Sequence, residues 1–187
     1  MKNKVFMLLV LIIITSRTSY AKNDKVVKED NWFFEYEEDV DKYYNLGKNK
    51  DINNKVTRGE FTKEIFSIYK KYKKEIPEIG VILDDVDDPD IISAVALGIA
   101  SGVGENKFEP DREITREESF VIINNLLKNL DIKLPVTMEI RIFKDSNEIS
   151  FYAQNAIQYL NKISIVKGVA NVTINPKGIL NVKELVA

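Results

Sequence analysis

The chain has 187 residues, with no cysteine, no histidine and a formal net charge of −2. The missing residue types exclude disulfides, a Ser-His-Asp triad, a cysteine nucleophile and any zinc site with His or Cys ligands. The mild acidity argues against a basic face for nucleic acid. We therefore expect a fold held by its hydrophobic core, with no nucleic-acid partner, no cofactor and no metal.

Residues 1–21 are typical of a secretory signal peptide. A basic start precedes the apolar run VFMLLVLIII, and Ser19-Tyr20-Ala21 forms a small-x-small cleavage site. A retained N-terminal anchor is the less favoured alternative, because a bilayer span needs about 20 apolar residues. Cleavage would leave 24 basic and 29 acidic residues, a net charge of −5. We expect a secreted protein without membrane contact after cleavage.

Residues 22–31 are polar and are predicted to form a mobile lead-in. Residues 32–46 have helical spacing of apolar and aromatic side chains, which favours a core role over a sugar-stacking platform. The aromatic positions are Trp32, Phe33, Tyr36, Tyr43 and Tyr44.

The same periodicity predicts four further helices, at 57–74, 91–102, 115–130 and 152–168. Between the first two lies DDVDDPD (Asp84 to Asp90), which invites a calcium hypothesis. The stretch lacks the glycine at position six and the glutamate at position twelve of an EF-hand loop. A solvated acidic loop is therefore favoured over a calcium site.

Two of the predicted helices begin with the same four-residue pattern, Thr-Arg-x-Glu. Thr57 with Glu60, and Thr115 with Glu118, match the capping box, in which each side chain bonds the other residue's backbone amide. Helix capping therefore accounts for the threonine and the glutamate of both copies.

Capping does not account for Arg58 and Arg116, which follow the threonines at the first helical position. The positive end of the helix dipole disfavours a cation there. Each guanidinium is therefore expected to serve an anion nearby. The two explanations are an anionic ligand and an internal ion pair with a carboxylate such as Asp85 or Asp145.

The chain contains internal repeats. A shift of 66 residues superposes four pairs of positions: Gly102 on Gly168, Phe108 on Ile174, Pro110 on Pro176 and Glu118 on Glu184. A shift of 58 superposes the two Thr-Arg-x-Glu copies. A period near 60 residues with two helices per unit predicts three repeats, at 32–76, 77–132 and 133–187.

These residues resemble the S-layer homology (SLH) domain family. The second repeat reads LGIASGVGENKFEPDREITREE (Leu97 to Glu118), close to the family's Gly-Ile-x-x-Gly, Phe-x-Pro and Ile-Thr-Arg-x-Glu elements. The third repeat matches moderately, and the first keeps only YYNLGK and VTRGE. The resemblance implies a mostly all-α fold, with helical repeats in a pseudo-threefold bundle and loop-rich prongs.

The resemblance also implies a non-catalytic module that binds the cell envelope, as in Gram-positive bacteria. The expected partner is a secondary cell-wall polysaccharide, pyruvylated in some cases, or a peptidoglycan-linked polymer, held in grooves between repeats. The implied location is the cell wall or cell surface. The implied ligand contacts are Arg58, Arg116, Gly98, Gly102, Gly104, Asp85 and Asp145.

The third repeat departs from the family pattern. Asn181 and Val182 stand at its Thr-Arg position, so no arginine serves a third groove, and the chain stops at Ala187 as the third long helix begins. Residues 32–46, another chain, or nothing would fill the gap that this leaves.

Two other functions compete with polysaccharide binding. The first, a glycosidase, needs two carboxylates across a cleft, and no pair is marked out by position. The second is an adaptor that binds another envelope protein. The positions of Arg58 and Arg116 distinguish polysaccharide binding from the adaptor function. Guanidiniums that face one solvent-open groove favour polysaccharide binding, and guanidiniums in internal ion pairs favour the adaptor.

Overall fold

The computed structural model describes residues 54–73, 76, 80–136, 140–166, 168 and 172–181. The segments predicted as signal peptide, lead-in and first helix (1–21, 22–31 and 32–46) lie outside the described residues, as do residues 182–187. Within the described part there are helices and isolated bridges but no strand, which confirms the all-α class. The helices are α4 (Arg58–Tyr72), α5 (Pro89–Ala96), α6 (Arg116–Asn129), η1 (Ser146–Glu148) and α7 (Phe151–Lys162).

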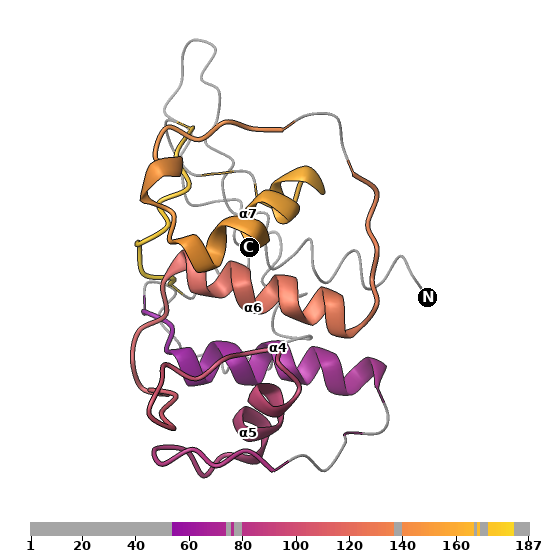
Figure 1. Ribbon diagram of the computed structural model, residues 1–187, viewed down its shortest axis with the longest axis vertical. Coiled ribbons are helices and arrows are strands. Elements are labelled where there is room, and N and C mark those ends of the chain that lie inside the picture. The colour runs from indigo at the N-terminus through magenta and orange to yellow at the C-terminus, as the bar shows by residue number, and fades with distance from the viewer. Residues whose placement is uncertain are drawn as a thin grey trace.

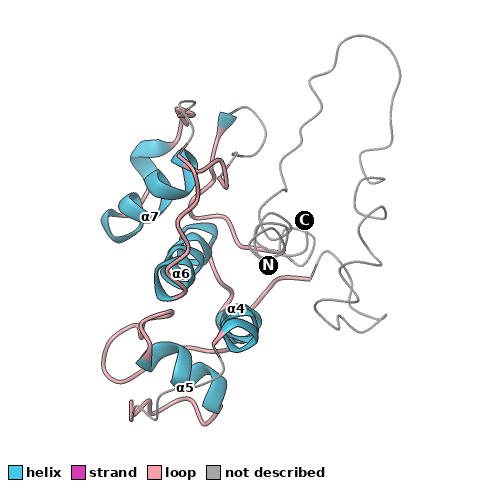
Figure 2. Cartoon of the chain, turned by 90° about the vertical axis from the view of Figure 1, so that its right-hand side faces the viewer, coloured by secondary structure: helices cyan, strands magenta, loops and turns pink. Residues whose placement is uncertain are grey.

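The helices form a row in which α6 lies between α4 and α7, and α5 flanks α4 (Figure 1). Figure 2 shows the same row with the view running nearly along the axes of α4 and α6. The long helices α4 and α6 are the two that begin with Thr-Arg-x-Glu. The short helix of each later repeat packs on the long helix of the repeat before it: α5 on α4, and α7 on α6.

Three backbone segments meet at the centre of the fold and form a closed ring of hydrogen bonds. The Ile114 amide donates to the Val56 carbonyl (3.0 Å), the Leu180 amide to Ile114 (3.0 Å), and the Val56 amide to Leu180 (2.9 Å). The side chains of all three are buried. These positions are 58 and 66 residues apart, the two shifts that align the repeats. The ring therefore marks a pseudo-threefold axis.

A single hydrophobic core joins the repeats. Its most deeply buried side chains come from both long helices, from α7 and from the loops: Phe61, Phe66, Phe108, Ile65, Ile68, Ile99, Ile114, Leu126, Leu127, Leu160 and Ile174. Phe108 and Ile174 are loop residues, yet neither exposes any surface. The loops are thus part of the core, which fixes their position against the long helices.

Both predicted capping boxes are present, at Thr57 with Glu60 and at Thr115 with Glu118. The polar ends of each motif therefore satisfy amides that a helix start leaves unpaired. Because both helices start at the central ring, the caps also fix the direction in which each helix leaves the axis.

Two predicted helix ends were wrong. The helix predicted to reach residue 102 ends at Ala96, and the one predicted to reach 168 ends at Lys162. In the first, Ile99 donates to Ala94 and Gly98 (φ +69°) to Val95, the paired bonds of a Schellman motif. The second ends in the same way, with a serine in the left-handed position (φ +59°). The apolar residues beyond both ends pack as loop, not as helix.

Candidate ligand-binding site

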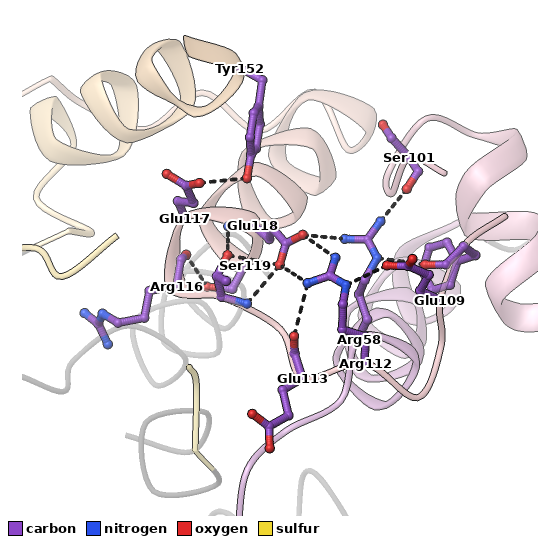
Figure 3. A network of polar contacts seen from close by, with 12 residues as sticks. Arg58, Ser101, Glu109, Arg112, Glu113, Arg116, Glu117, Glu118, Ser119 and Tyr152 are labelled. Carbon is purple, nitrogen blue, oxygen red and sulfur yellow. Dashed lines mark hydrogen bonds and ion pairs between the residues drawn. The ribbon is translucent and has the colours of Figure 1, made fainter. Parts of the chain in front are cut away.

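A pocket of about 560 Å³ lies where parts of all three repeats meet. Its walls come from the start of α4, the loop after α5, one face of α6, and α7. The polar part of the lining consists of Arg58, Ser101, Glu118, Asn125 and Tyr152, and the apolar part includes Ile99, Val103, Val121 and Ile122. Figure 3 shows several of the polar side chains converging from different elements. An apolar surface with a few polar groups is typical of small-ligand sites.

Arg58 lines this pocket while it ties three segments together. Its Nε donates to the Phe108 carbonyl (3.0 Å), one Nη to the Ser101 carbonyl, and the other to Glu118 Oε1 (3.4 Å). The guanidinium also stacks over the Phe108 ring, 4.6 Å from its centroid. Burial lowers the pKa of Arg58, although the charge of Glu118 opposes this shift. Three of its five N–H donors are thereby engaged.

Glu118 lies between two arginines. Arg112 donates to both of its oxygens, at 2.6 and 3.2 Å, while Arg58 donates to Oε1 as well, at 3.4 Å. Burial raises the pKa of Glu118, but hydrogen bonds from Arg112 and Thr115 and the charge of Arg58 outweigh it and lower the pKa. Glu118 is therefore both the cap of α6 and the centre of a charged cluster beneath the pocket (Figure 3).

Arg116 occupies the equivalent place at the next repeat boundary. Its Nε donates to the Ile174 carbonyl (3.0 Å), as that of Arg58 does to Phe108, and it lies 5.6 Å from the Phe120 ring centroid. The side chain is buried and is not part of the described pocket. In both copies the arginine that the sequence marks therefore joins its own helix to the loop of the following repeat.

The two predicted aspartates use their carboxylates on backbone amides. Asp85 accepts from Phe108 (2.9 Å) and the next residue (2.8 Å), and Asp145 accepts from Ile174 (2.9 Å) and the next residue (2.7 Å). These bonds, chiefly from the second amide, lower the pKa of Asp85, although partial desolvation opposes them. Of the two explanations left open for Arg58, the internal ion pair is present, but its carboxylate is Glu118 and not one of the two aspartates given as examples.

Of the three predicted loop glycines, only Gly102 lines the pocket. A Cβ atom there would lie 2.8 Å from the Lys107 carbonyl oxygen, so the tight turn requires glycine. Gly98 closes the end of α5, and Gly104 (φ +110°) lies in the turn itself. These two shape the loop from outside the pocket.

Two site residues were not singled out from the sequence. Tyr152, the second residue of α7, forms a pocket wall, and the buried Glu117 accepts a hydrogen bond from its hydroxyl at 2.9 Å. The only available signal was that the second motif reads Thr-Arg-Glu-Glu where the first has Thr-Arg-Gly-Glu. That difference cannot reveal a partner 35 residues away.

The acidic stretch at 84–90 has separate roles for its side chains. Asp88 caps α5 and lies 3.2 Å from Lys63, while Asp90 pairs with Lys70 at 2.7 Å. Among the described residues, no group of three acidic side chains is arranged to hold a metal ion. In the same part of the chain, no helix has the length and hydropathy to cross a bilayer.

We expect the stability of the fold to fall in acid. The pKa of Glu117 is lowered because hydrogen bonds from Lys177 and Ser150 outweigh the upward effect of burial, and that of Glu118 is lowered as described above. A lowered folded-state pKa gives stability that is complete above the ordinary glutamate pKa of about 4.3 and is lost as pH falls through the folded value. Urea unfolding at pH 7 and pH 3 measures this effect. An unchanged midpoint would contradict it, and Glu117→Gln should flatten the dependence.

The sequence model of the family described as "S-layer homology domain" matches residues 84–118. This segment runs from the loop before α5 to the capping box of α6, and it contains Ser101 and Glu118 of the pocket. The match therefore coincides with the repeat that carries most of the site.

Three known proteins illustrate what the chain is similar to. An endoglucanase of Bacillus sp. (strain KSM-635) is 30% identical to this chain over 88 residues. These residues cover 47% of this chain and 9% of the length of the endoglucanase. A cell surface protein of Thermoanaerobacter kivui is 31% identical over 108 residues, 56% of this chain and 14% of its own. An amylopullulanase of Thermoanaerobacterium thermosulfurigenes is 31% identical over 130 residues, 67% of this chain and 7% of its own. The similarity thus covers a small part of each relative.

Proposed function

Because residues 84–118 belong to the S-layer homology domain family, a family of non-catalytic cell-surface anchoring modules, we propose that this chain binds a cell-wall polysaccharide through the Arg58 pocket. Signal peptide 1–21 and repeats 32–76, 77–132 and 133–187 are part of this proposal. The two enzymes among the relatives match over less than a tenth of their length, so their catalytic names do not extend to this chain.

The observation that carries the proposal is the composition of the pocket. An exposed aromatic wall, Tyr152, faces a space that also has an amide, Asn125, and a guanidinium, Arg58. Sugar rings present C–H faces that pack on aromatic rings and hydroxyl or amide groups that bond to such polar side chains. The site therefore has both kinds of contact that a saccharide unit needs.

A finer proposal concerns an anionic substituent such as a pyruvyl ketal. Arg58 has two N–H donors beyond the three that bond Phe108, Ser101 and Glu118, and Arg112 adds a second positive charge beside Glu118. A carboxylate on the sugar would find partial charge compensation here. Comparison of pyruvylated with chemically depyruvylated polymer tests this point alone, because an uncharged unit should then bind less tightly.

We expect Tyr152→Ala to reduce binding to purified cell walls about 5- to 150-fold, since loss of an aromatic contact costs about 1–3 kcal/mol in comparable stacking. Co-sedimentation with sacculi, with and without their non-peptidoglycan polymer, measures this. The matched control is Phe151→Ala, because Phe151 is the adjacent aromatic residue, is 89% exposed and lies outside the pocket lining. The proposal would be refuted if the wild-type protein bound equally well to walls without the polymer, or if both variants lost binding to the same extent.

One observation favours the alternative, an adaptor that binds another envelope protein. Arg58 and Arg116 are both buried and bonded to loop carbonyls, and Arg58 is also in an internal ion pair. However, Arg58 lines an open pocket at the same time, so burial alone does not decide between the two. Protein that binds walls independently of the polymer, and loses that binding when the walls are protease-treated, would establish the adaptor function.

A further inference from the structure

Glu117 is a carboxylate with only 3% of its side chain exposed, and it holds two segments of the third repeat, the start of α7 and the loop at Lys177. The Ser150 amide, at the start of α7, donates to Oε2 at 3.0 Å. The Tyr152 hydroxyl and Lys177 Nζ donate to Oε1 at 2.9 and 2.6 Å. A buried charge is stable only when it is paired and hydrogen-bonded. The three donors, one of them cationic, meet that requirement.

The same position in the first motif shows that the fold does not need this carboxylate. Gly59 is the counterpart of Glu117, and the amides of both donate to a proline carbonyl in the following repeat, Pro110 and Pro176 respectively. A Cβ at Gly59 would lie 3.0 Å from the Pro110 carbonyl oxygen, a tight contact that disfavours a longer side chain there. One repeat boundary is thus built without an acid. The acid at the other boundary serves a local purpose.

That purpose lies on the pocket side of Tyr152. Tyr152 is part of the pocket lining, and its hydroxyl is directed toward Glu117 (Figure 3). The residue is 56% exposed, so packing alone does not fix the ring. A side chain held in its binding orientation before the ligand arrives loses less conformational freedom on binding. The hydrogen bond to Glu117 therefore pre-organises the pocket wall.

Resting on the proposed function, we infer that Glu117 is a positioning residue: it anchors the Tyr152 hydroxyl and so sets the aromatic wall against which a sugar ring packs. Its charge matters because it also holds Lys177, which donates to the Ser150 side chain as well. Through these contacts the third repeat, which contributes no arginine of its own to the described pocket, completes a site whose other walls come from the first two repeats.

The test is a double-mutant cycle on the whole chain, with the variants Glu117→Gln, Tyr152→Phe and both together. The affinity for solubilised wall polymer is measured at a temperature at which each variant is folded. Each single change should weaken binding at least about tenfold, the effect of losing one hydrogen bond to a charged group. The double variant should be no weaker than the weaker single variant, because both changes remove the same interaction. Glu113→Gln, an exposed carboxylate paired with Lys55, is the matched control and should bind normally.

A second readout does not need ligand. In protein labelled with 3-fluorotyrosine, the Tyr152 signal is identified by its absence in Tyr152→Phe, and Glu117→Gln should shift or broaden it. Wild-type affinity in Glu117→Gln, or losses that add in the double variant while the signal stays unshifted, would overturn the inference and leave polysaccharide binding intact. Wild-type protein that fails to bind the polymer would overturn the proposed function, and the inference with it.

Discussion

Replacing Arg58 with methionine is expected to lower the free energy of unfolding by about 3 kcal/mol. The change removes the donors to the carbonyls of Phe108 and Ser101 and leaves those acceptors without this partner. Glu118 loses less, because Arg112 still donates to both of its oxygens. The cost thus comes mainly from the carbonyls that join α4 to the loop of the second repeat.

Urea unfolding measures this change, and Arg58→Lys provides the comparison. An ammonium keeps the charge but has neither the fork nor the flat face of a guanidinium. It cannot bond both carbonyls and stack on the Phe108 ring at once, so about half of the loss should remain. If Arg58→Met lowered the free energy of unfolding by less than about 1 kcal/mol, the main role of the arginine would be ligand binding and not stability. If lysine were as stable as wild type, charge alone would suffice.

Local sequence patterns predicted the starts of the two long helices correctly. The capping boxes at Thr57 and Thr115 depend on residues only three positions apart, so the local sequence pattern is sufficient to predict the hydrogen bonds. The three residues of the hydrogen-bond ring, Val56, Ile114 and Leu180, are separated by 58 and 66 residues, the same shifts that align the sequence. Both kinds of prediction rest on chemistry that is repeated in the chain.

The roles of the charged site residues were harder to predict, because their partners are distant in sequence. Arg58 bonds a carbonyl 50 residues later, and Arg116 one 58 residues later. The charge argument predicted an anion near each arginine. Arg58 does pair with Glu118, but both arginines also bond backbone carbonyls, which the residue pattern does not reveal. For the same reason Asp85 was assigned to ligand, while the structure places it on loop amides.

The predictions of two helix ends were wrong for a different physical reason. The apolar periodicity of α5 and α7 continues past Ala96 and Lys162 because the following residues are also buried, as loop. Gly98 was a visible stop signal for the first, since glycine adopts a positive φ without strain. Ser164 stops the second with the same geometry, and serine gives no such signal.

Shortening Ile114 to alanine is expected to lower the free energy of unfolding by about 2–5 kcal/mol, towards the upper end of that range. Ile114 has no exposed surface, and its backbone belongs to the central ring. Neighbouring segments cannot move in to fill the cavity without breaking a hydrogen bond of that ring. Ile82→Ala, where the side chain is 80% exposed, is the control and should change stability by less than about 0.5 kcal/mol.

The third member of the ring decides how far the third repeat belongs to the same folding unit. Leu180 is buried to 6% exposure and exchanges its backbone bonds with the first and second repeats. Leu180→Ala should therefore shift the whole urea transition, with one midpoint by circular dichroism and by fluorescence, because the ring closes only when all three segments are in place. Two separate transitions, or a stability equal to wild type, would show that the first two repeats fold without the third and form their part of the pocket lining alone. In that case the third repeat would contribute Tyr152 from a unit that docks independently.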